Sequence, residues 1–241
     1  MTSTRKTALA GGVLYLITFI AILRLVLYGP VLNDPGFIVS SSSDAAPLWA
    51  AVIETVVALA GIGTAVALFP VVKRQSEAFA LGFVASRIVE AGIIFVGIIS
   101  LLSIVTLRQD LGAAAGAEAA TLVTIGKSLV VIQNWTFLFG QTLMPGVNAL
   151  MLGYVMYRSG LVPRLIPALG LIGGPLMISS VLGQIIGINE QYSVWSGIAL
   201  IPIFIWELSL GLYLTFKGFK PAAITAPSVP SAASNTAYAP A

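Results

Sequence analysis

The 241-residue sequence contains no cysteine and no histidine, and only 9% of its residues are charged. The absence of both residue types excludes disulfides, thiol nucleophiles, the usual zinc sites, haem ligation by histidine and a Ser-His-Asp triad. Soluble globular domains contain about 25% charged residues. The scarcity of charge therefore excludes an ordinary soluble domain, and the missing side chains leave few routes to catalysis. We predict no cofactor.

The residues that are abundant are apolar. Hydrophobic residues make up 58% of the chain, and the mean hydropathy is +0.99. The formal net charge is +3, but the twelve basic residues are spread between apolar runs and form no patch. This pattern excludes nucleic acid as a partner and predicts that the chain is surrounded by a lipid bilayer.

Six apolar runs are long enough to cross a bilayer, which requires roughly 20 apolar residues per helix. They predict an all-α, polytopic membrane protein, a bundle of six transmembrane helices, at about 7–28, 47–72, 80–107, 135–157, 165–188 and 194–216. We expect the first run to be retained, because it is longer than the roughly 7–15 apolar residues of a signal peptide.

The remaining segments complete a single domain over residues 1–220. A weakly polar, Ala-rich stretch containing Lys127 precedes the fourth span, and it predicts an extramembrane helix at about 117–134. The tail, residues 221–241, is rich in Ala, Pro and Ser and carries no charge. Such a segment cannot bury enough apolar surface to order itself, so we predict a disordered cytoplasmic tail.

The loop charges predict the orientation. Basic residues lie on one side of the predicted spans: Arg5, Lys6, Lys73, Arg74, Arg158, Arg164, Lys217 and Lys220. The other side is acidic, with only Arg108 and Lys127 as basic residues. By the positive-inside rule both termini are cytoplasmic. An aromatic belt is predicted at the outer span ends, formed by Tyr28, Trp49, Trp135, Tyr192 and Trp195.

Five charged residues fall within or near the spans: Arg24, Glu54, Arg87, Glu90 and Glu207. A charge at the centre of a transmembrane helix costs roughly 2.5 to 3.5 kcal/mol, so these residues should be paired. Depth along the helices predicts an outer-leaflet pair of Arg24 with Glu54. It also pairs Arg87 with Glu90, three residues away, and with Glu207. Two cations then face three anions, so one carboxylate must be protonated, hydrated through a cavity or matched by a distant group such as Lys127.

The fourth span adds three amides, Asn134, Gln141 and Asn148, spaced seven residues apart and therefore predicted to share one helix face. Pro145 has no N–H to donate to the carbonyl of Gln141, and a broken helix with free polar groups could form a binding site. We therefore predict a buried polar cluster of Arg87, Glu90, Glu207, Gln141 and Asn148.

Each feature also has a purely structural interpretation. Arg24 and Glu54 could be an interfacial pair, or Arg24 could extend toward the membrane surface. The amides could simply join helices, at about 0.6 kcal/mol per hydrogen bond.

Four stretches carry a resemblance to a known family: RKTALAGGVLYLITFIA, IGTAVALFPVVKRQSEAFALGFVASRIVEAGIIFVGIISLLSIVTL, WTFLFGQTLMPGVNALMLGYVMYRSGLVPRLIPALGLIGGPL and IPIFIWELSLGLYLTFKGFKP. Together they resemble the bacterial integral-membrane family known as domain of unknown function 4386. The resemblance implies six spans in the bacterial inner (plasma) membrane, with Arg87, Glu90 and Glu207 among the family's charged positions. It implies no activity, substrate or catalytic residue. Family members often have a His-Asp pair where this chain has Gln133-Asn134, which argues against proton handling there.

Three functions remain open. The first is binding or translocation of a small solute, ion or lipid head group in a hydrated cavity. Arg87 would contact an anionic group, and Glu90 or Glu207 would act as counter-ion or proton acceptor. The second is a structural or partner-binding membrane protein whose charges set the helix register. The third is an intramembrane enzyme, for which no nucleophile, catalytic residue or metal ligand stands out.

Overall fold

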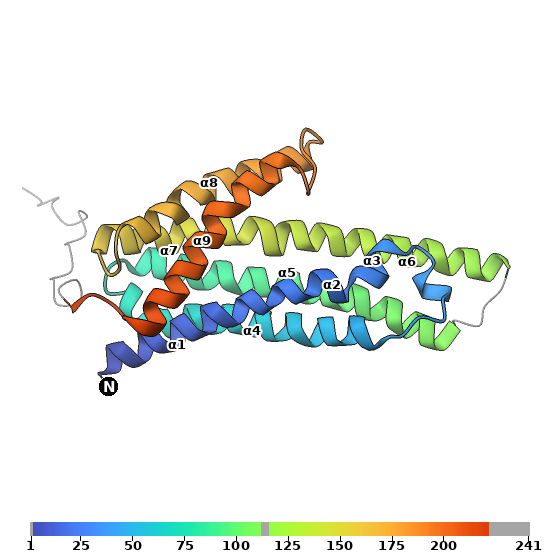
Figure 1. Ribbon diagram of the computed structural model, residues 1–241, viewed down its shortest axis with the longest axis horizontal. Coiled ribbons are helices and arrows are strands. Elements are labelled where there is room, and N and C mark those ends of the chain that lie inside the picture. The colour runs from blue at the N-terminus through green and yellow to red at the C-terminus, as the bar shows by residue number, and fades with distance from the viewer. Residues whose placement is uncertain (1, 112–115, 222–241) are drawn as a thin grey trace, which may run out of the picture.

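The computed structural model describes residues 2–111 and 116–221. Its regular elements are all helical: α1 (Ser3–Thr18), η1 (Phe19–Leu23), α2 (Arg24–Leu27), α3 (Gly29–Asn33), η2 (Phe37–Val39), α4 (Ala45–Val72), α5 (Glu77–Leu111), α6 (Ala117–Thr136), η3 (Phe137–Leu143), α7 (Met144–Ser159), α8 (Leu165–Ile185) and α9 (Val194–Phe216). Six helical runs are long and apolar enough to cross a membrane, which confirms the predicted all-α, six-span architecture (Figure 1). Apart from Pro221, the predicted disordered tail lies outside the described residues.

The six spans pack into a closed ring. Each span contacts the next one along the chain, and α1 contacts α9. Gly12 makes this last contact possible, because an added Cβ would lie 2.6 Å from the backbone nitrogen of Thr215 and 2.8 Å from the carbonyl oxygen of Gly211. The Arg5 guanidinium donates hydrogen bonds of 2.6 to 3.2 Å to three carbonyls at the C-terminal end of α9. These bonds satisfy carbonyls that the helix itself leaves unpaired.

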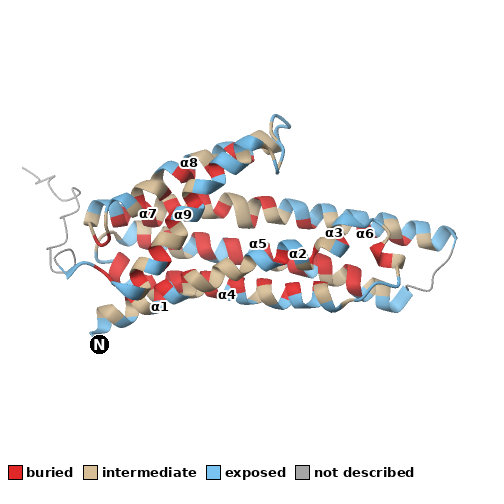
Figure 2. Ribbon diagram, viewed as in Figure 1, coloured by how far each residue is buried: buried red, intermediate tan, exposed pale blue. Residues whose placement is uncertain are grey.

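The burial of side chains depends on which side of the ring they face. Buried residues line its interior, and exposed residues cover the outside (Figure 2). Many of the exposed side chains are large and apolar, for example Leu59, Val66 and Ile99, each more than half exposed. Apolar side chains in this position are suited to contact lipid tails. The start of α1, the α4–α5 and α7–α8 connections and the C-terminal end of α9 lie at one end of the bundle (Figure 1), and these segments with the residues next to them carry the eight basic residues of the predicted inner loops. Their cytoplasmic location stays a prediction.

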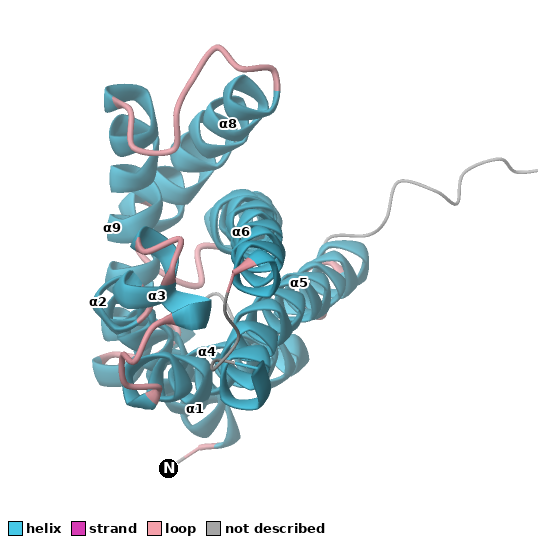
Figure 3. Cartoon of the chain, turned by 90° about the vertical axis from the view of Figure 1, so that its right-hand side faces the viewer, coloured by secondary structure: helices cyan, strands magenta, loops and turns pink. Residues whose placement is uncertain are grey.

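The opposite end extends beyond the other spans. Residues Ala117–Ser159 form one continuous helical run of 43 residues, about 65 Å at 1.5 Å per residue, whereas the hydrocarbon core of a bilayer is about 30 Å thick. In Figure 1, α5 and α6 continue past the loop that joins α8 to α9. We call this end the cap; it comprises α3, η2, the start of α4, the end of α5 and the first half of α6. Figure 3 shows α3 and α6 beside one another there.

The cap differs from the sequence-based prediction in three respects. The segment between the first two predicted spans contains the short helices α3 and η2, which the sequence did not predict. Tyr28 has 0% exposure and belongs to a hydrophobic core of the cap, so its predicted place in the aromatic belt is wrong, whereas Trp49 and Trp135 are exposed. The helix predicted at 117–134 forms, but it joins the fourth span without a break. Its position outside the membrane stays a prediction that its length supports.

Candidate functional site

The ion pairs of Arg87 lie in the interior of the ring, toward the predicted cytoplasmic side. Arg87 on α5 donates from Nη1 to Glu90 Oε2 at 3.0 Å and from Nη2 to Glu207 Oε1, on α9, at 3.2 Å. Arg87 is 3% exposed and Glu90 8% exposed. One guanidinium thus serves two carboxylates from two spans, as the depth argument predicted.

Further contacts position these side chains. The Arg87 guanidinium lies over the rings of Tyr15 and Phe83, 5.2 and 5.7 Å from their centroids. Asn148 on α7 donates to Glu90 Oε2 at 2.6 Å, so the structure brings it together with Arg87 and Glu90. Ser86 in turn donates to Asn148 Oδ1 at 2.5 Å. Glu90 therefore accepts hydrogen bonds from both α5 and α7, and the cluster joins three spans.

The outer pair also forms. Arg24 Nη1 donates to Glu54 Oε1 at 2.6 Å, and both residues are at most 5% exposed. The Arg24 guanidinium lies 4.1 Å from the centroid of the Phe137 ring. Arg24 is therefore held inside the bundle by a carboxylate and an aromatic face, and it does not extend to the membrane surface.

Gln141 occupies a different position from the one predicted. Its Nε2 donates to Glu54 Oε1 at 2.6 Å, so its hydrogen bond goes to the outer pair and not to the inner cluster. Gln141 nevertheless lines the same cavity as Arg87, Glu90 and Glu207. The outer pair and the inner cluster were predicted at different depths. Gln141 connects them, because it bonds to Glu54 and lines the cavity beside Arg87.

The reason for this shift is the π-helix η3, which contains Gln141 and ends just before Met144 and Pro145. Pro145 cannot donate the α-helical bond to the Gln141 carbonyl, and a π-helix, with bonds from i to i+5, places one more residue in the turn. The seven-residue spacing then fails: Asn134 is exposed, whereas Gln133 is 2% exposed. The predicted three-amide stripe is wrong at Asn134, and the helix bulges at Pro145 without breaking.

A cavity of about 120 Å³ lies against the inner cluster. Its walls include Thr18, Gly61, Arg87, Glu90, Gln141 and Glu207. Both non-α turns of the long helices border it, since Ala21 belongs to the 3-10 helix η1 and Gln141 to η3. A 3-10 or π turn inside a long helix frequently accompanies a functional site. A small cavity with charged and polar residues in its walls therefore lies beside the inner cluster.

Three buried polar atoms of the network have no hydrogen-bond partner among residues 2–111 and 116–221: Arg24 Nε, Glu54 Oε2 and Arg87 Nε. Buried polar groups in proteins are nearly always paired, with protein or with water. These atoms therefore have the capacity to bind water or a polar ligand, and they occur in both the outer and the inner group.

Sequence reasoning missed the contribution of the first span. Tyr15 lies under the Arg87 guanidinium, and Thr18 lines the cavity. A usable signal existed, because Tyr15 and Thr18 are the only polar side chains between Thr7 and Arg24. Within the described part of the chain, no group of three or more acidic residues is close enough to hold a metal ion.

Comparisons with curated proteins and with solved structures found no match. A family model matches residues 10–218, which include most of the first span, the other five spans and every residue of the two charged groups. The chain therefore belongs to the family described as domain of unknown function DUF4386.

Proposed function

We propose that this membrane protein binds a small monovalent cation in the cavity beside Arg87, Glu90 and Glu207. The proposal rests on one observation, the presence of a cavity against a buried group with surplus negative charge. One guanidinium and two carboxylates carry a formal charge of −1, and an uncompensated charge in a low-dielectric interior is costly. A cation in the cavity would neutralise it.

The geometry favours a cation over other occupants. Both terminal nitrogens of Arg87 already contact carboxylates, so only its Nε could donate to the anionic group considered from the sequence. A proton shared by the carboxylates would neutralise the charge without any cavity. A divalent ion usually takes several carboxylate oxygens, whereas here two carboxylates share one guanidinium.

The size of the cavity limits which ligands could fit. Its volume of about 120 Å³ corresponds to about four water molecules at roughly 30 Å³ each. Pockets for drug-sized molecules measure about 300–1,000 Å³. The cavity thus suits a partly hydrated inorganic cation or a small protonated amine better than a lipid head group.

The proposed entry route passes Gln141. This residue also lines a wider cleft of about 330 Å³ between η3 and the α8–α9 hairpin, together with Thr142, Met177, Gln184, Ser196 and Leu200. Gln141 therefore forms part of the wall of both spaces. The amide and hydroxyl groups of the cleft could replace the hydration shell of an entering ion.

Thermal unfolding of the purified protein in lipid nanodiscs tests the proposal. At constant ionic strength, lithium, sodium, potassium or ammonium chloride replaces N-methyl-D-glucamine chloride, whose cation is too large for the cavity. A ligand at 100 times its Kd stabilises the folded state by about 2.7 kcal/mol, so we expect one small cation to raise the unfolding midpoint by about 5 to 10 °C.

Two glycine variants locate the effect. Gly61→Leu fills the cavity, because a Cβ there would point toward Arg87 Nη1 at 3.8 Å, whereas a Cβ at Gly92 meets nothing within 4 Å. We expect Gly61→Leu to lose the cation response and Gly92→Leu to keep it. Equal midpoints in all five salts would refute the proposal, as would a response that survives in Gly61→Leu.

A structural role is the second candidate, and one observation favours it. The pair between Arg87 on α5 and Glu207 on α9 connects spans that are not neighbours in the ring. Such a bond would set the position of α9 relative to α5 whether or not an ion binds. The charge-removal variants described in the Discussion separate the two roles.

A further inference from the structure

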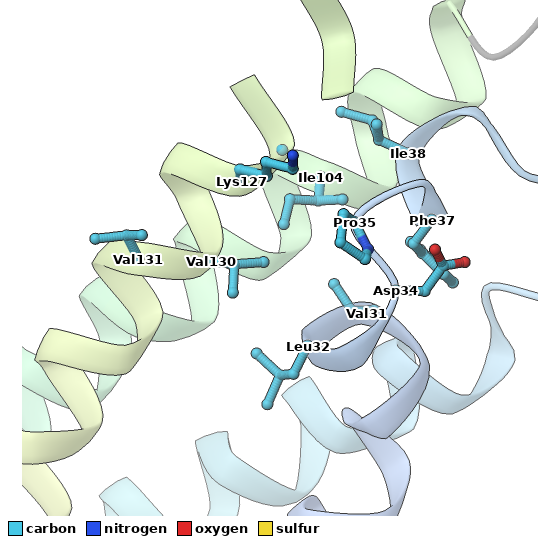
Figure 4. Close-up of a pocket in the computed structure, with 11 residues that line it drawn as sticks. Val31, Leu32, Asp34, Pro35, Phe37, Ile38, Ile104, Lys127, Val130 and Val131 are labelled. Atoms are coloured by element: carbon cyan, nitrogen blue, oxygen red, sulfur yellow. The ribbon is translucent and has the colours of Figure 1, made fainter. Parts of the chain in front are cut away.

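The cap contains an apolar pocket that the proposed cation site does not involve. Its volume is about 340 Å³, within the range of about 300–1,000 Å³ typical of small-molecule sites. Val31, Phe37, Ile38 and Ile104 form its buried walls, each at most 2% exposed. Figure 4 shows apolar side chains from the α3–η2 segment facing those of α6 across this space.

Two charged residues lie at its rim, and they are not equivalent. Lys127 on α6 lines the pocket and has no hydrogen-bond or ion-pair partner in the described ranges 2–111 and 116–221. Asp34 Oδ1 accepts a hydrogen bond from the backbone nitrogen of Gly36 at 2.8 Å, so this carboxylate is engaged in its own turn. In Figure 4 the Asp34 carboxylate lies beyond Pro35 as seen from Lys127. Asp34 also has no ion-pair partner in the described part of the chain, but its carboxylate is held in the turn, so Lys127 is the charged side chain that remains free to contact a ligand in the pocket.

The position of this apolar pocket along the helices makes it unusual. Lys127 precedes the exposed Trp135 by eight residues on one helix, about 12 Å further from the membrane centre at 1.5 Å per residue. Trp135 belongs to the predicted aromatic belt, so we expect the pocket to lie at or beyond the lipid head groups. Lipid tails cover apolar surfaces within the spans, but they do not reach this level.

We propose that the cap pocket binds a single-chain amphiphile with an anionic head group, that is, a fatty carboxylate. The chain would fill the space between α3 and α6, and the carboxylate would contact Lys127 in water. A volume near the lower end of the usual range favours one chain over two. This site is independent of the cation site, because the two cavities share no lining residue.

Photolabelling of the full-length protein in nanodiscs of zwitterionic lipid tests this site. The probe is a dodecanoate carrying a diazirine, and the control probe is the corresponding dodecanol. We expect dodecanoate labels, mapped by mass spectrometry, to concentrate at residues 31–38 and 126–131. Exposed charge pairs contribute little, so the carboxylate should label about two- to fivefold more than the alcohol.

Matched variants give the test its controls. Val130→Trp fills the pocket, and Ile132→Trp places the same indole side chain at an exposed position of α6 outside it. Lys127→Gln removes the rim charge, and Lys73→Gln removes a lysine at the other end. We expect Val130→Trp to abolish pocket labelling, Lys127→Gln to reduce it to the level of the alcohol, and both controls to retain it. Labelling that persists in Val130→Trp, or equal labelling by both probes in the native chain, overturns the proposal.

Discussion

Replacing Arg87 with leucine alone is expected to lower the free energy of unfolding by about 3 to 5 kcal/mol. The substitution removes the only guanidinium among the described residues that contacts Glu90 and Glu207, and it leaves two carboxylates inside the ring. The remaining bond from Asn148 to Glu90 supplies no compensating charge. The measurement is thermal or denaturant unfolding in nanodiscs. Arg158→Leu, at an exposed position of α7, serves as the control and should unfold within about 0.5 kcal/mol of the native chain.

The triple variant Arg87→Leu, Glu90→Leu, Glu207→Leu is expected to regain most of that loss, because apolar residues that replace a whole buried ion group are often neutral or stabilising. A folded triple variant without a cation response supports the cation site. If the native chain shows no cation response, the structural role is the only one of the two candidate functions that remains. The cation site and the structural role share one premise, namely that Glu90 and Glu207 are both charged and depend on Arg87. An Arg87→Leu variant as stable as the native chain contradicts this premise.

Replacing Gly12 with valine is expected to destabilise the fold by about 3 kcal/mol, at the upper end of overpacking effects. An added Cβ would lie 2.5 Å from Thr215 Oγ1 and 2.6 Å from the Thr215 backbone nitrogen. Rotation of a side chain relieves the first contact but not the second. The clash can therefore be relieved only by moving α1 away from α9, which opens the ring.

The same unfolding assay measures this effect, and the smaller change Gly12→Ala tests its cause. Gly12→Ala adds only the Cβ and should already lose stability, whereas Gly92→Ala, with nothing within 4 Å of its Cβ, should stay within about 0.5 kcal/mol of the native chain. If Gly12→Ala and Gly92→Ala unfold alike, the close α1–α9 contact is not what holds the ring together.

The ion pairs were predictable because two simple constraints determine them. A charge inside the membrane requires a partner, and regular helices convert residue number into depth. These constraints paired Arg24 with Glu54, and Arg87 with both Glu90 and Glu207, before any tertiary information. The surplus of one carboxylate also followed from the sequence, by counting alone.

The amide stripe was not predictable in the same way. The prediction of this stripe assumed a regular α-helix through Pro145. The π-helix η3 places one more residue in the turn, so the residues that share a helix face shift by one position. Asn134 consequently turned outward, Gln133 turned inward, and Gln141 bonded to Glu54. A local change in helix geometry thus decided which amide belongs to which charged group.

The sequence by itself determined the number of spans, their approximate limits and the charged partners, because these depend on free energies of transfer and on distances along single helices. Only the tertiary structure decided how the ring closes at Gly12, where the cavity lies, and that Gln141 connects the two charged groups. It alone revealed the cap and its pocket beside Lys127. Cavities and close helix contacts arise from the relative positions of several helices, and those positions depend on packing across the bundle that no single segment encodes.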